Sequence, residues 1–276
     1  MGKEELVNEL LIYLISENKE LGKVDVPKDY SNKRKLLRAV MNVREPKAIS
    51  PEILKLQDEL LSKENKDKNI ISPYDLLTVG EVFKETKIPF EDKIILWQGD
   101  ITTINADAIV NAANSKMLGC FAPLHRCIDN AIHSAAGIQL RLECRELMEK
   151  QGKDEPTGRA KITGAYNLPS KYVLHTVGPI IYDALTEEDC GLLASCYSSC
   201  LEEAKKHEDI KTVAFCCIST GEFRFPKDEA AKIAVETVSR WLENNRDVLD
   251  RIIFNVFTVE DYDEYSKLFG EYKSSF

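Results

Sequence analysis

The chain contains the stretch Asp107-Ala108-Ile109-Val110-Asn111-Ala112-Ala113-Asn114. Its first half is a short apolar run with β-branched residues, which predicts a strand buried on both faces of a sheet. Its second half is small and polar and follows the strand directly. Ligands of open α/β sheets bind beyond the carboxyl ends of the strands. The stretch therefore predicts both a central strand and one wall of a binding site.

Further apolar runs of the same character lie on either side of this stretch. They occupy residues 94–97, 172–175, 213–217 and 251–256. Helical patterns separate them, around residues 128–149, 191–207 and 227–243. Near-continuous apolar strands alternating with helices predict an α/β fold, a three-layer α/β/α sandwich with a mixed, largely parallel sheet.

The N-terminal part of the chain has a different pattern. Apolar residues recur at helical spacing over residues 3–18, over 35–43 and after Pro51, whereas the charged run 63–68 predicts a linker or solvated turn. We expect residues 1–85 to form a helical N-terminal appendage and residues 86–276 to form the sandwich domain. The appendage carries no motif with recognisable chemistry, which leaves docking, partner binding or stabilisation as its role.

The overall charge limits the classes of partner. The 276 residues carry a formal net charge of −9, which repels nucleic acid, so any phosphate must be held locally by backbone N–H groups, a helix terminus or a metal. The apolar stretch at residues 6–15 contains Asn8 and Glu9 and is shorter than the ~20 residues that span a bilayer. We expect neither a nucleic-acid nor a membrane partner.

Eight cysteines occur without an export signal, which predicts a reducing cytoplasm and makes clustered cysteines candidate metal ligands. Cys120, His125 and Cys127 fall within eight residues, and two thiolates with an imidazole suit Zn²⁺. Three protein ligands leave a fourth position open, as in catalytic sites. Two alternatives stay open: three unconnected loop residues, or a zinc ion that only stabilises the loop.

Six short strings in this order resemble the macrodomain family, which binds ADP-ribose. They are residues 99–102, 107–114, 128–133, 160–163, 175–179 and 219–221. The resemblance covers residues 92–270 and implies the sandwich fold. The loop around Cys120 resembles a bacterial subgroup of zinc-dependent macrodomains, which are protein ADP-ribosyl hydrolases associated with sirtuin-type ADP-ribosyltransferases.

This resemblance implies the residues that bind the substrate. Asp100 would accept a hydrogen bond from the adenine amino group, beside the backbone N–H of Ile101, and Phe257 would stack on the adenine. An Asx turn at Asp100 and ordinary packing of Phe257 are the alternatives. A loop of backbone donors would wrap the diphosphate. It consists of Ser219, Thr220, Gly221, Glu222 and Phe223, with Glu222 at a position where the family usually has a small or apolar residue.

The resemblance also implies the catalytic residues. Asn111 and Asn114 would bind ribose hydroxyls, and Asp129 would orient or activate water or hold the ribose for attack at its anomeric carbon. An N-cap at Asp129 is the alternative role, and the two can coexist. Zinc would polarise a ribose hydroxyl or lower the pKa of a bound water.

The expected function is a zinc-dependent hydrolase that removes ADP-ribose from modified protein side chains, with a carboxylate ester as the favoured linkage. The expected partners are an ADP-ribosylated protein and a sirtuin-type ADP-ribosyltransferase system. The alternatives are a reader that binds ADP-ribose without cleaving it, an O-acetyl-ADP-ribose deacetylase, and an interaction scaffold that acts through residues 1–85.

Overall fold

Six strands form a single mixed sheet in the computed structural model, which describes residues 1–18 and 24–271. Their order across the sheet is β1-β6-β5-β2-β4-β3. All neighbours are parallel except β3 and β4, which pair antiparallel at one edge. The strands are β1 (Ile94–Gln98), β2 (Ala108–Ala113), β3 (Ala160–Gly164), β4 (Tyr172–Val177), β5 (Thr212–Phe215) and β6 (Arg251–Val256).

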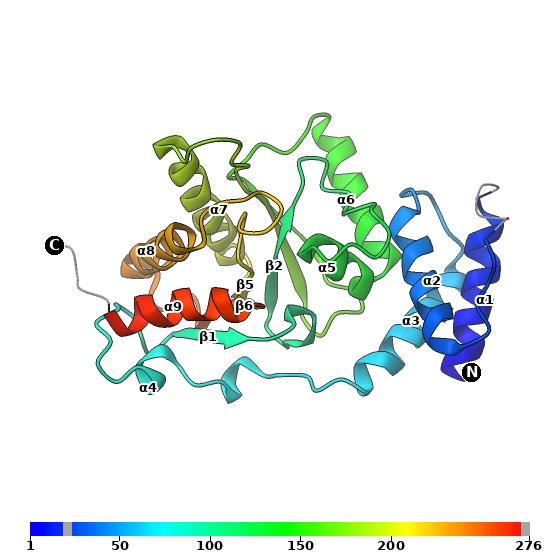
Figure 1. The fold of residues 1–276 in the computed structure, drawn as a ribbon, viewed down its shortest axis with the longest axis horizontal. Coiled ribbons are helices and arrows are strands. Elements are labelled where there is room, and N and C mark those ends of the chain that lie inside the picture. Colours follow the sequence, from blue (N-terminus) through cyan, green and yellow to red (C-terminus); the bar gives the residue numbers. More distant parts are fainter. Residues whose placement is uncertain (19–23, 272–276) are drawn as a thin grey trace.

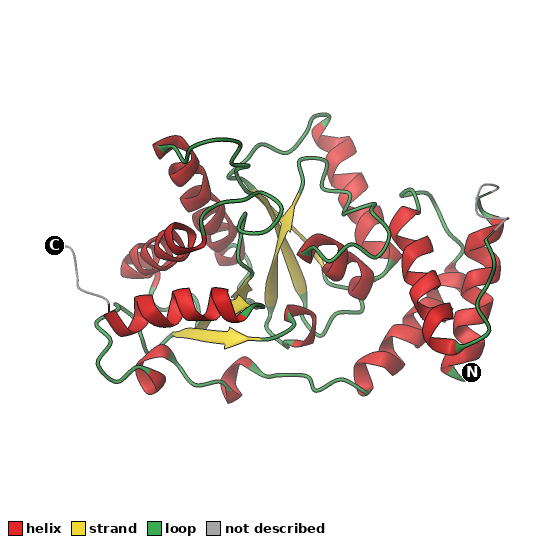
Figure 2. Ribbon diagram, in the orientation of Figure 1, coloured by secondary structure: helices red, strands yellow, loops and turns green. Residues whose placement is uncertain are grey.

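Helices cover both faces of this sheet (Figure 2). One layer consists of α7 (Glu187–Lys205), α8 (Lys227–Asn245) and α9 (Val259–Glu271), which pack side by side. The other contains α5 (Ile128–Ala136) against β2 and α6 (Ile138–Gln151) against β3. The predicted α/β/α sandwich with a largely parallel sheet is confirmed. No helix in the described part of the chain has the length and apolarity needed to cross a bilayer.

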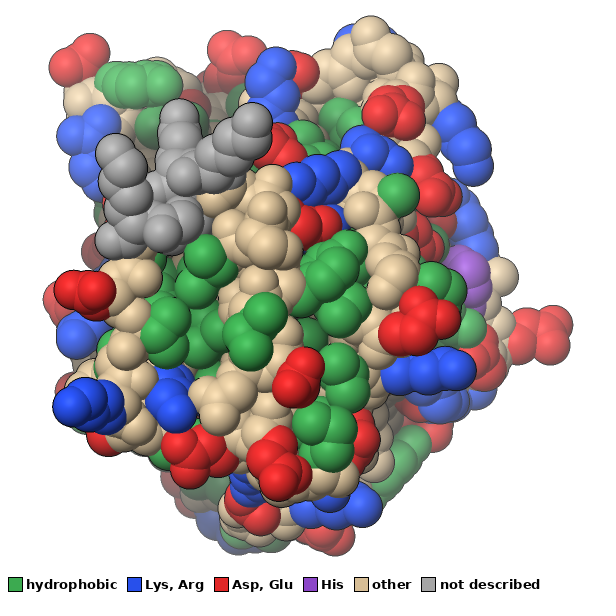
Figure 3. Space-filling view, turned by 90° about the vertical axis from the view of Figure 1, so that its right-hand side faces the viewer, with side chains coloured by type: hydrophobic (Ala, Val, Ile, Leu, Met, Phe, Trp, Pro, Cys, Tyr) green, Lys and Arg blue, Asp and Glu red, His purple; other side chains and the backbone are tan. Residues whose placement is uncertain are grey.

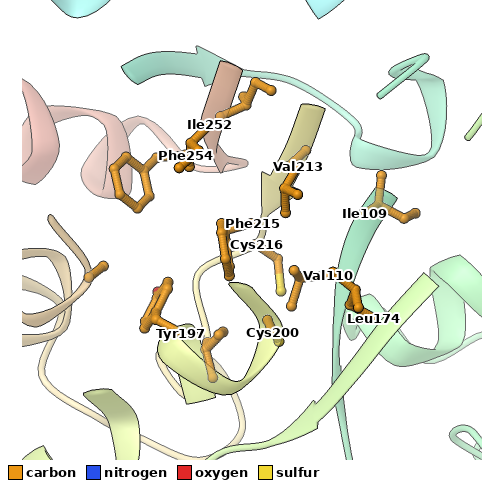
Figure 4. Packing of buried hydrophobic residues seen from close by; sticks show 14 of the residues in the cluster. Ile109, Val110, Leu174, Tyr197, Cys200, Val213, Phe215, Cys216, Ile252 and Phe254 are labelled. Carbon is orange, nitrogen blue, oxygen red and sulfur yellow. The ribbon is translucent and has the colours of Figure 1, made fainter. Parts of the chain in front are cut away.

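The core between the sheet and α7 consists of branched and aromatic side chains, shown in Figure 4. Val110 and Leu174 come from adjacent strands, and Phe215 and Phe254 continue the row toward the other edge. Tyr197 of α7 packs on Phe215, with ring centroids 5.1 Å apart. Burial of the strands on both faces explains why their sequences are apolar runs rather than alternating patterns.

The N-terminal helices form a bundle with its own core at one end of the molecule (Figure 1). They are α1 (Lys3–Ser16), α2 (Tyr30–Val43) and α3 (Pro51–Lys66). The side chains of Asp29 and Ser50 cap α2 and α3, and Pro51 begins α3 with a fixed φ. Ile138 of α6 joins the buried cluster of the bundle. The outer face of the bundle mixes apolar side chains with charges of both signs (Figure 3).

The segment after α3 runs along the sheet domain (Figure 1). It contains η2 (Pro73–Asp75) and α4 (Val79–Val82), and it leads into β1; the 3-10 turn η3 (Ile101–Thr103) follows β1. Ile71 pairs with Ile104, and Val79 and Ile88 are buried in the core of the sandwich. The segment from Ile71 to Ile88 therefore packs on the sandwich rather than on the helical bundle.

Three local expectations differ from the structure. The charged run predicted as a linker continues α3 as far as Lys66, because Lys and Glu favour helix and Arg34 of α2 pairs with Glu64. The helical pattern at 128–149 is divided at Gly137, where φ is +97°. The edge strand β3 and the short α4 were not predicted, since short elements give weak periodicity. The helix α9 was also not predicted, although its apolar residues recur at helical spacing.

We expect Gly137→Ala to destabilise the fold. A Cβ at this positive φ would lie 2.5 Å from Gln57 Nε2 of α3, whose side-chain oxygen accepts from the Ile138 N–H. Urea denaturation should show a loss of about 1–3 kcal/mol in the free energy of unfolding. Gly191→Ala is the matched control. It lies within α7 with no neighbour near the added Cβ, so it should be neutral or stabilising by up to about 1 kcal/mol.

Candidate active site

The site is built around Asp129 in the first turn of α5. Its side chain is buried, and two amides hold its carboxylate. Asn111 Nδ2 donates to Oδ1 at 2.8 Å, and Asn114 Nδ2 lies 3.3 Å from Oδ2. Asn111 belongs to β2 and Asn114 follows it, so the central strand and the helix N-terminus meet at this carboxylate. The structure thus brings these three predicted site residues together.

The environment of Asp129 favours a carboxylate that exchanges its proton near neutral pH. Burial raises the pKa of Asp129 to about 6, against the opposing effects of the Asn111 hydrogen bond and of Arg141. His133, one turn along α5, places Nε2 3.5 Å from Asp129 Oδ1. Burial lowers the pKa of His133 well below its usual range, so this imidazole is neutral and leaves Asp129 without a cationic partner there.

A second hydrogen bond, to His175 of the neighbouring strand β4, fixes the side chain of Asn111. Its Nδ2 lies 3.2 Å from His175 Nδ1, and His175 Nε2 lies 2.9 Å from Thr163 Oγ1. Burial lowers the pKa of His175 to about 3, so the ring is neutral; with Nδ1 accepting from Asn111, Nε2 carries the proton and donates to Thr163. Because Asn111 is fully buried, its amide positions Asp129. The ribose contacts predicted for the two asparagines stay predictions.

The three predicted metal ligands lie together beside Asp129. The donor atoms of Cys120, His125 and Cys127 are all within 4.8 Å of one another, and Cys120 Sγ is 3.7 Å from His125 Nδ1. A tetrahedral zinc ion with ordinary Zn–S and Zn–N bonds separates such a pair of atoms by about 3.6 Å. Two thiols and an imidazole at this spacing fit zinc, and their partial exposure gives a ligand access to the site.

Packing and hydrogen bonds with α5 hold both ends of the loop that carries these candidate ligands. Gly119 has φ of +79°, and a Cβ there would come within 3.0 Å of the His133 ring. Cys127 is the N-cap of α5, with its Sγ accepting from the Asn130 N–H. Burial and the nearby Cys120 raise the pKa of Cys127 to about 12. A bound cation is therefore required to hold this residue as a thiolate at neutral pH.

Glu222 makes a contact that the sequence did not predict. Its Oε1 lies 3.4 Å from His125 Nε2, on the opposite side of the ring from Cys120. Metal-bound histidines commonly donate their second N–H to a carboxylate, which fixes the tautomer and the ring orientation. Spacing along the chain could not reveal this contact, because 97 positions separate the two residues.

The predicted diphosphate loop presents free backbone donors. Within the described residues, no acceptor lies in hydrogen-bonding geometry to the backbone N–H groups from Ser219 to Phe223. Ser219 has φ of +65°, and the absence of a side chain at Gly178 leaves room for Ser219 Oγ. A hydrogen bond from the Phe225 N–H to the Ser219 carbonyl joins the two ends of the loop. Consecutive unpaired N–H groups suit an anion.

The predicted adenine residues lie at two neighbouring strand ends. Asp100 follows β1, and its Oδ1 accepts from the Thr102 N–H and hydroxyl, so the Asx-type cap is present. Ile101 is buried beside it. Phe257 follows β6, the partner of β1, and its side chain is 74% exposed. Phe257 therefore offers a free ring face rather than a core contact, and adenine binding by these residues stays a prediction.

The chain is similar to known proteins in both sequence and fold. Residues 110–234 match the Macro domain family. The chain is 48% identical to "Protein-ADP-ribose hydrolase" of Treponema medium, over 94% of this chain and 96% of the relative. It is 42% identical, over 87% of this chain and 41% of the relative, to a "Probable bifunctional ADP-ribose hydrolase/ADP-ribosyltransferase" of Fusarium oxysporum f. sp. cubense. The Trypanosoma brucei macrodomain in complex with ADP-ribose aligns with a TM-score of 0.64 and 29% identity, covering 83% of this chain and 94% of that one.

We expect the purified protein to contain about one zinc ion per chain and Cys120→Ala to lose it, since two ligands do not hold zinc tightly. Elemental analysis after gel filtration measures the content. Cys190→Ala is the control, because it removes a partly buried thiol of α7 outside the loop. Equal zinc in wild type and Cys120→Ala would contradict the assignment.

Proposed function

Because the chain belongs to the macrodomain family of protein-ADP-ribose hydrolases, we propose that it removes ADP-ribose from modified proteins by a zinc-dependent hydrolysis at the distal ribose. One observation carries the zinc dependence. The donors of Cys120, His125 and Cys127 converge on a single point, immediately before the helix turn that presents the buried Asp129. A module that only bound ADP-ribose would require neither group.

The unpaired backbone donors from Ser219 to Phe223 would bind the diphosphate, which explains how a protein of net charge −9 binds an anion. The adenine would lie between the Asp100–Ile101 turn and the exposed ring of Phe257. The contact between Glu222 and His125 brings the proposed diphosphate loop (residues 219–223) next to the loop of residues 119–127, called the metal loop below. The distal ribose would then reach Asn114 and Asp129.

In the proposed reaction, Asp129 accepts a proton from the water that attacks the anomeric carbon of the distal ribose. A new bond forms between the water oxygen and this carbon, while the bond to the protein side chain breaks. For a carboxylate ester the leaving carboxylate takes the bonding electrons and needs no proton. Asn111 and Asn114 keep the Asp129 carboxylate in place. The raised pKa of Asp129 makes it a better base than an exposed carboxylate.

Cys120, His125 and Cys127 would hold the zinc ion. When bound, zinc supplies a positive charge that polarises a ribose hydroxyl or a water molecule.

The proposed partner is an ADP-ribosylated protein. The name of the Fusarium oxysporum relative couples a hydrolase to an ADP-ribosyltransferase, which supports a transferase acting in the same system. A sirtuin-type transferase is the proposal that follows from the resemblance of the metal loop. Two ligands of the proposed site are thiols that must stay reduced, which supports a reducing compartment such as the cytoplasm.

We expect Asp129→Asn to reduce the release of free ADP-ribose from an ADP-ribosylated acceptor protein by at least about 100-fold, because the amide cannot accept the proton. ADP-ribose affinity, measured by calorimetry, should change by less than about threefold. The control is Asp154→Asn, which changes the charge equally at an exposed carboxylate paired with Lys116.

Two outcomes would contradict the proposal. Binding of ADP-ribose by the wild-type protein without release would indicate a reader. Release of acetate from O-acetyl-ADP-ribose, with no cleavage of the modified protein, would indicate the deacetylase.

A further inference from the structure

The N-terminal helical bundle contacts the candidate active site directly. Helix α2 lies beside α5, the helix that begins at the metal loop (Figure 1). Arg38 and Asn42 are one turn apart on α2 and both face α5. The sequence motifs and the family resemblance assign no role to either residue.

Arg38 holds the side chain of Asn130 in one orientation. Its guanidinium donates to Asn130 Oδ1 at 2.8 Å, while Asn130 Nδ2 donates to the Ala122 carbonyl at 3.0 Å. A flipped amide would place two donors together at Arg38 and two acceptors together at Ala122. The Asn130 N–H in turn contacts Cys127 Sγ at 3.4 Å. Arg38 therefore fixes a group that binds the metal loop at two points.

Asn42 binds the middle of the same loop. It is buried, its Oδ1 accepts from the Leu124 N–H at 3.0 Å, and its Nδ2 donates to Ser134 Oγ at 3.0 Å. Leu124 has φ of +57°, an unfavourable conformation for a residue with a branched side chain. Such a conformation persists where the surroundings hold it. The hydrogen bond from Asn42 is one such restraint, and Leu124 directly precedes the metal ligand His125.

Arg141 of α6 connects the end of α2 to the start of the loop. Its guanidinium donates to the carbonyls of Met41, Asn42 and Arg44 at 3.2, 2.8 and 2.7 Å. These carbonyls lie at the negative end of α2. The same guanidinium lies 4.3 Å from the centroid of the Phe121 ring. The C-terminus of α2 and the loop are thus fixed to one buried cation.

We propose that the N-terminal bundle is part of the hydrolase site, and that Arg38 and Asn42 are positioning residues that hold residues 119–127 in the geometry needed to bind the metal. The inference rests on the proposed zinc site. The hydrogen bonds from Arg38 to Asn130 and from Leu124 to Asn42 place both residues on the side of the bundle that faces the site. The proposed role of the appendage is therefore stabilisation of this loop.

The test compares Arg38→Met and Asn42→Ala with the matched control Arg34→Met. Arg34 lies one turn earlier on α2, and it forms a two-point ion pair with Glu64 inside the bundle. Arg34→Met thus removes a charged side chain and its contact within the bundle, whereas Arg38 and Asn42 contact the loop network. Zinc affinity is measured on the full chain by competition with a chromogenic chelator. We expect Arg38→Met and Asn42→Ala to weaken zinc binding by about tenfold or more and Arg34→Met by less than twofold.

Hydrogen exchange of the metal-free protein provides a second measurement that does not depend on zinc. Peptides covering residues 119–130 should exchange faster in Arg38→Met and Asn42→Ala than in the wild type and Arg34→Met. This result would support the positioning role even if the wild type bound no zinc, in which case only the proposed function would fail.

Unchanged exchange and unchanged zinc affinity in both variants would overturn the inference, as would an equal loss in Arg34→Met. If Arg38→Met does not fold, Arg38→Lys takes its place. It keeps the charge but lacks the planar guanidinium that contacts Asn130, and we expect the same direction of effect.

Discussion

A carboxylate that is removed from water must recover its hydrogen bonds from the protein. In this chain the Asp129 carboxylate recovers them from Asn111 and Asn114, at the end of the central strand β2. The rest of the site is arranged around that pairing. His175 and Thr163 fix the amide that holds Asp129, α5 starts at the carboxylate, and the metal loop ends where α5 begins. The candidate base is thus held at the end of a buried strand that is paired on both sides.

The proposed metal loop is held in place differently from Asp129. The three candidate ligands, Cys120, His125 and Cys127, lie in one short segment without regular structure, so their geometry depends on groups from elsewhere in the chain. Glu222 contacts the imidazole from the diphosphate loop, and Asn42 contacts the backbone from the N-terminal bundle. Asp129 is positioned mainly by a strand and a helix, whereas the loop is contacted by side chains from two distant segments of the chain. Neither Glu222 nor Asn42 belongs to the hydrophobic core of the sandwich, so substitutions there can test the support of the loop separately from that of the fold.

Features encoded locally could be predicted from the sequence, and features that depend on distant contacts could not. The apolar run before Asn111 predicted β2, and the spacing of Cys120, His125 and Cys127 predicted that their donor atoms meet. The full burial of Asn111 was not predictable, because it depends on His175 in the neighbouring strand. The division of the 128–149 helical pattern occurs at Gly137, which lies against Gln57 of the distant helix α3. The roles of Arg38 and Glu222 depend on contacts across the tertiary fold.

The Glu222–His125 contact has a thermodynamic consequence for the two loops that it joins. One loop is proposed to bind an anionic nucleotide and the other a divalent cation, so restricting either loop lowers the entropy that the other must lose on binding. Equilibrium linkage makes this coupling mutual: any factor by which the cation tightens nucleotide binding is the factor by which the nucleotide tightens cation binding. The concentrations of free metal ion and of modified substrate would then together determine the fraction of the protein that has both bound.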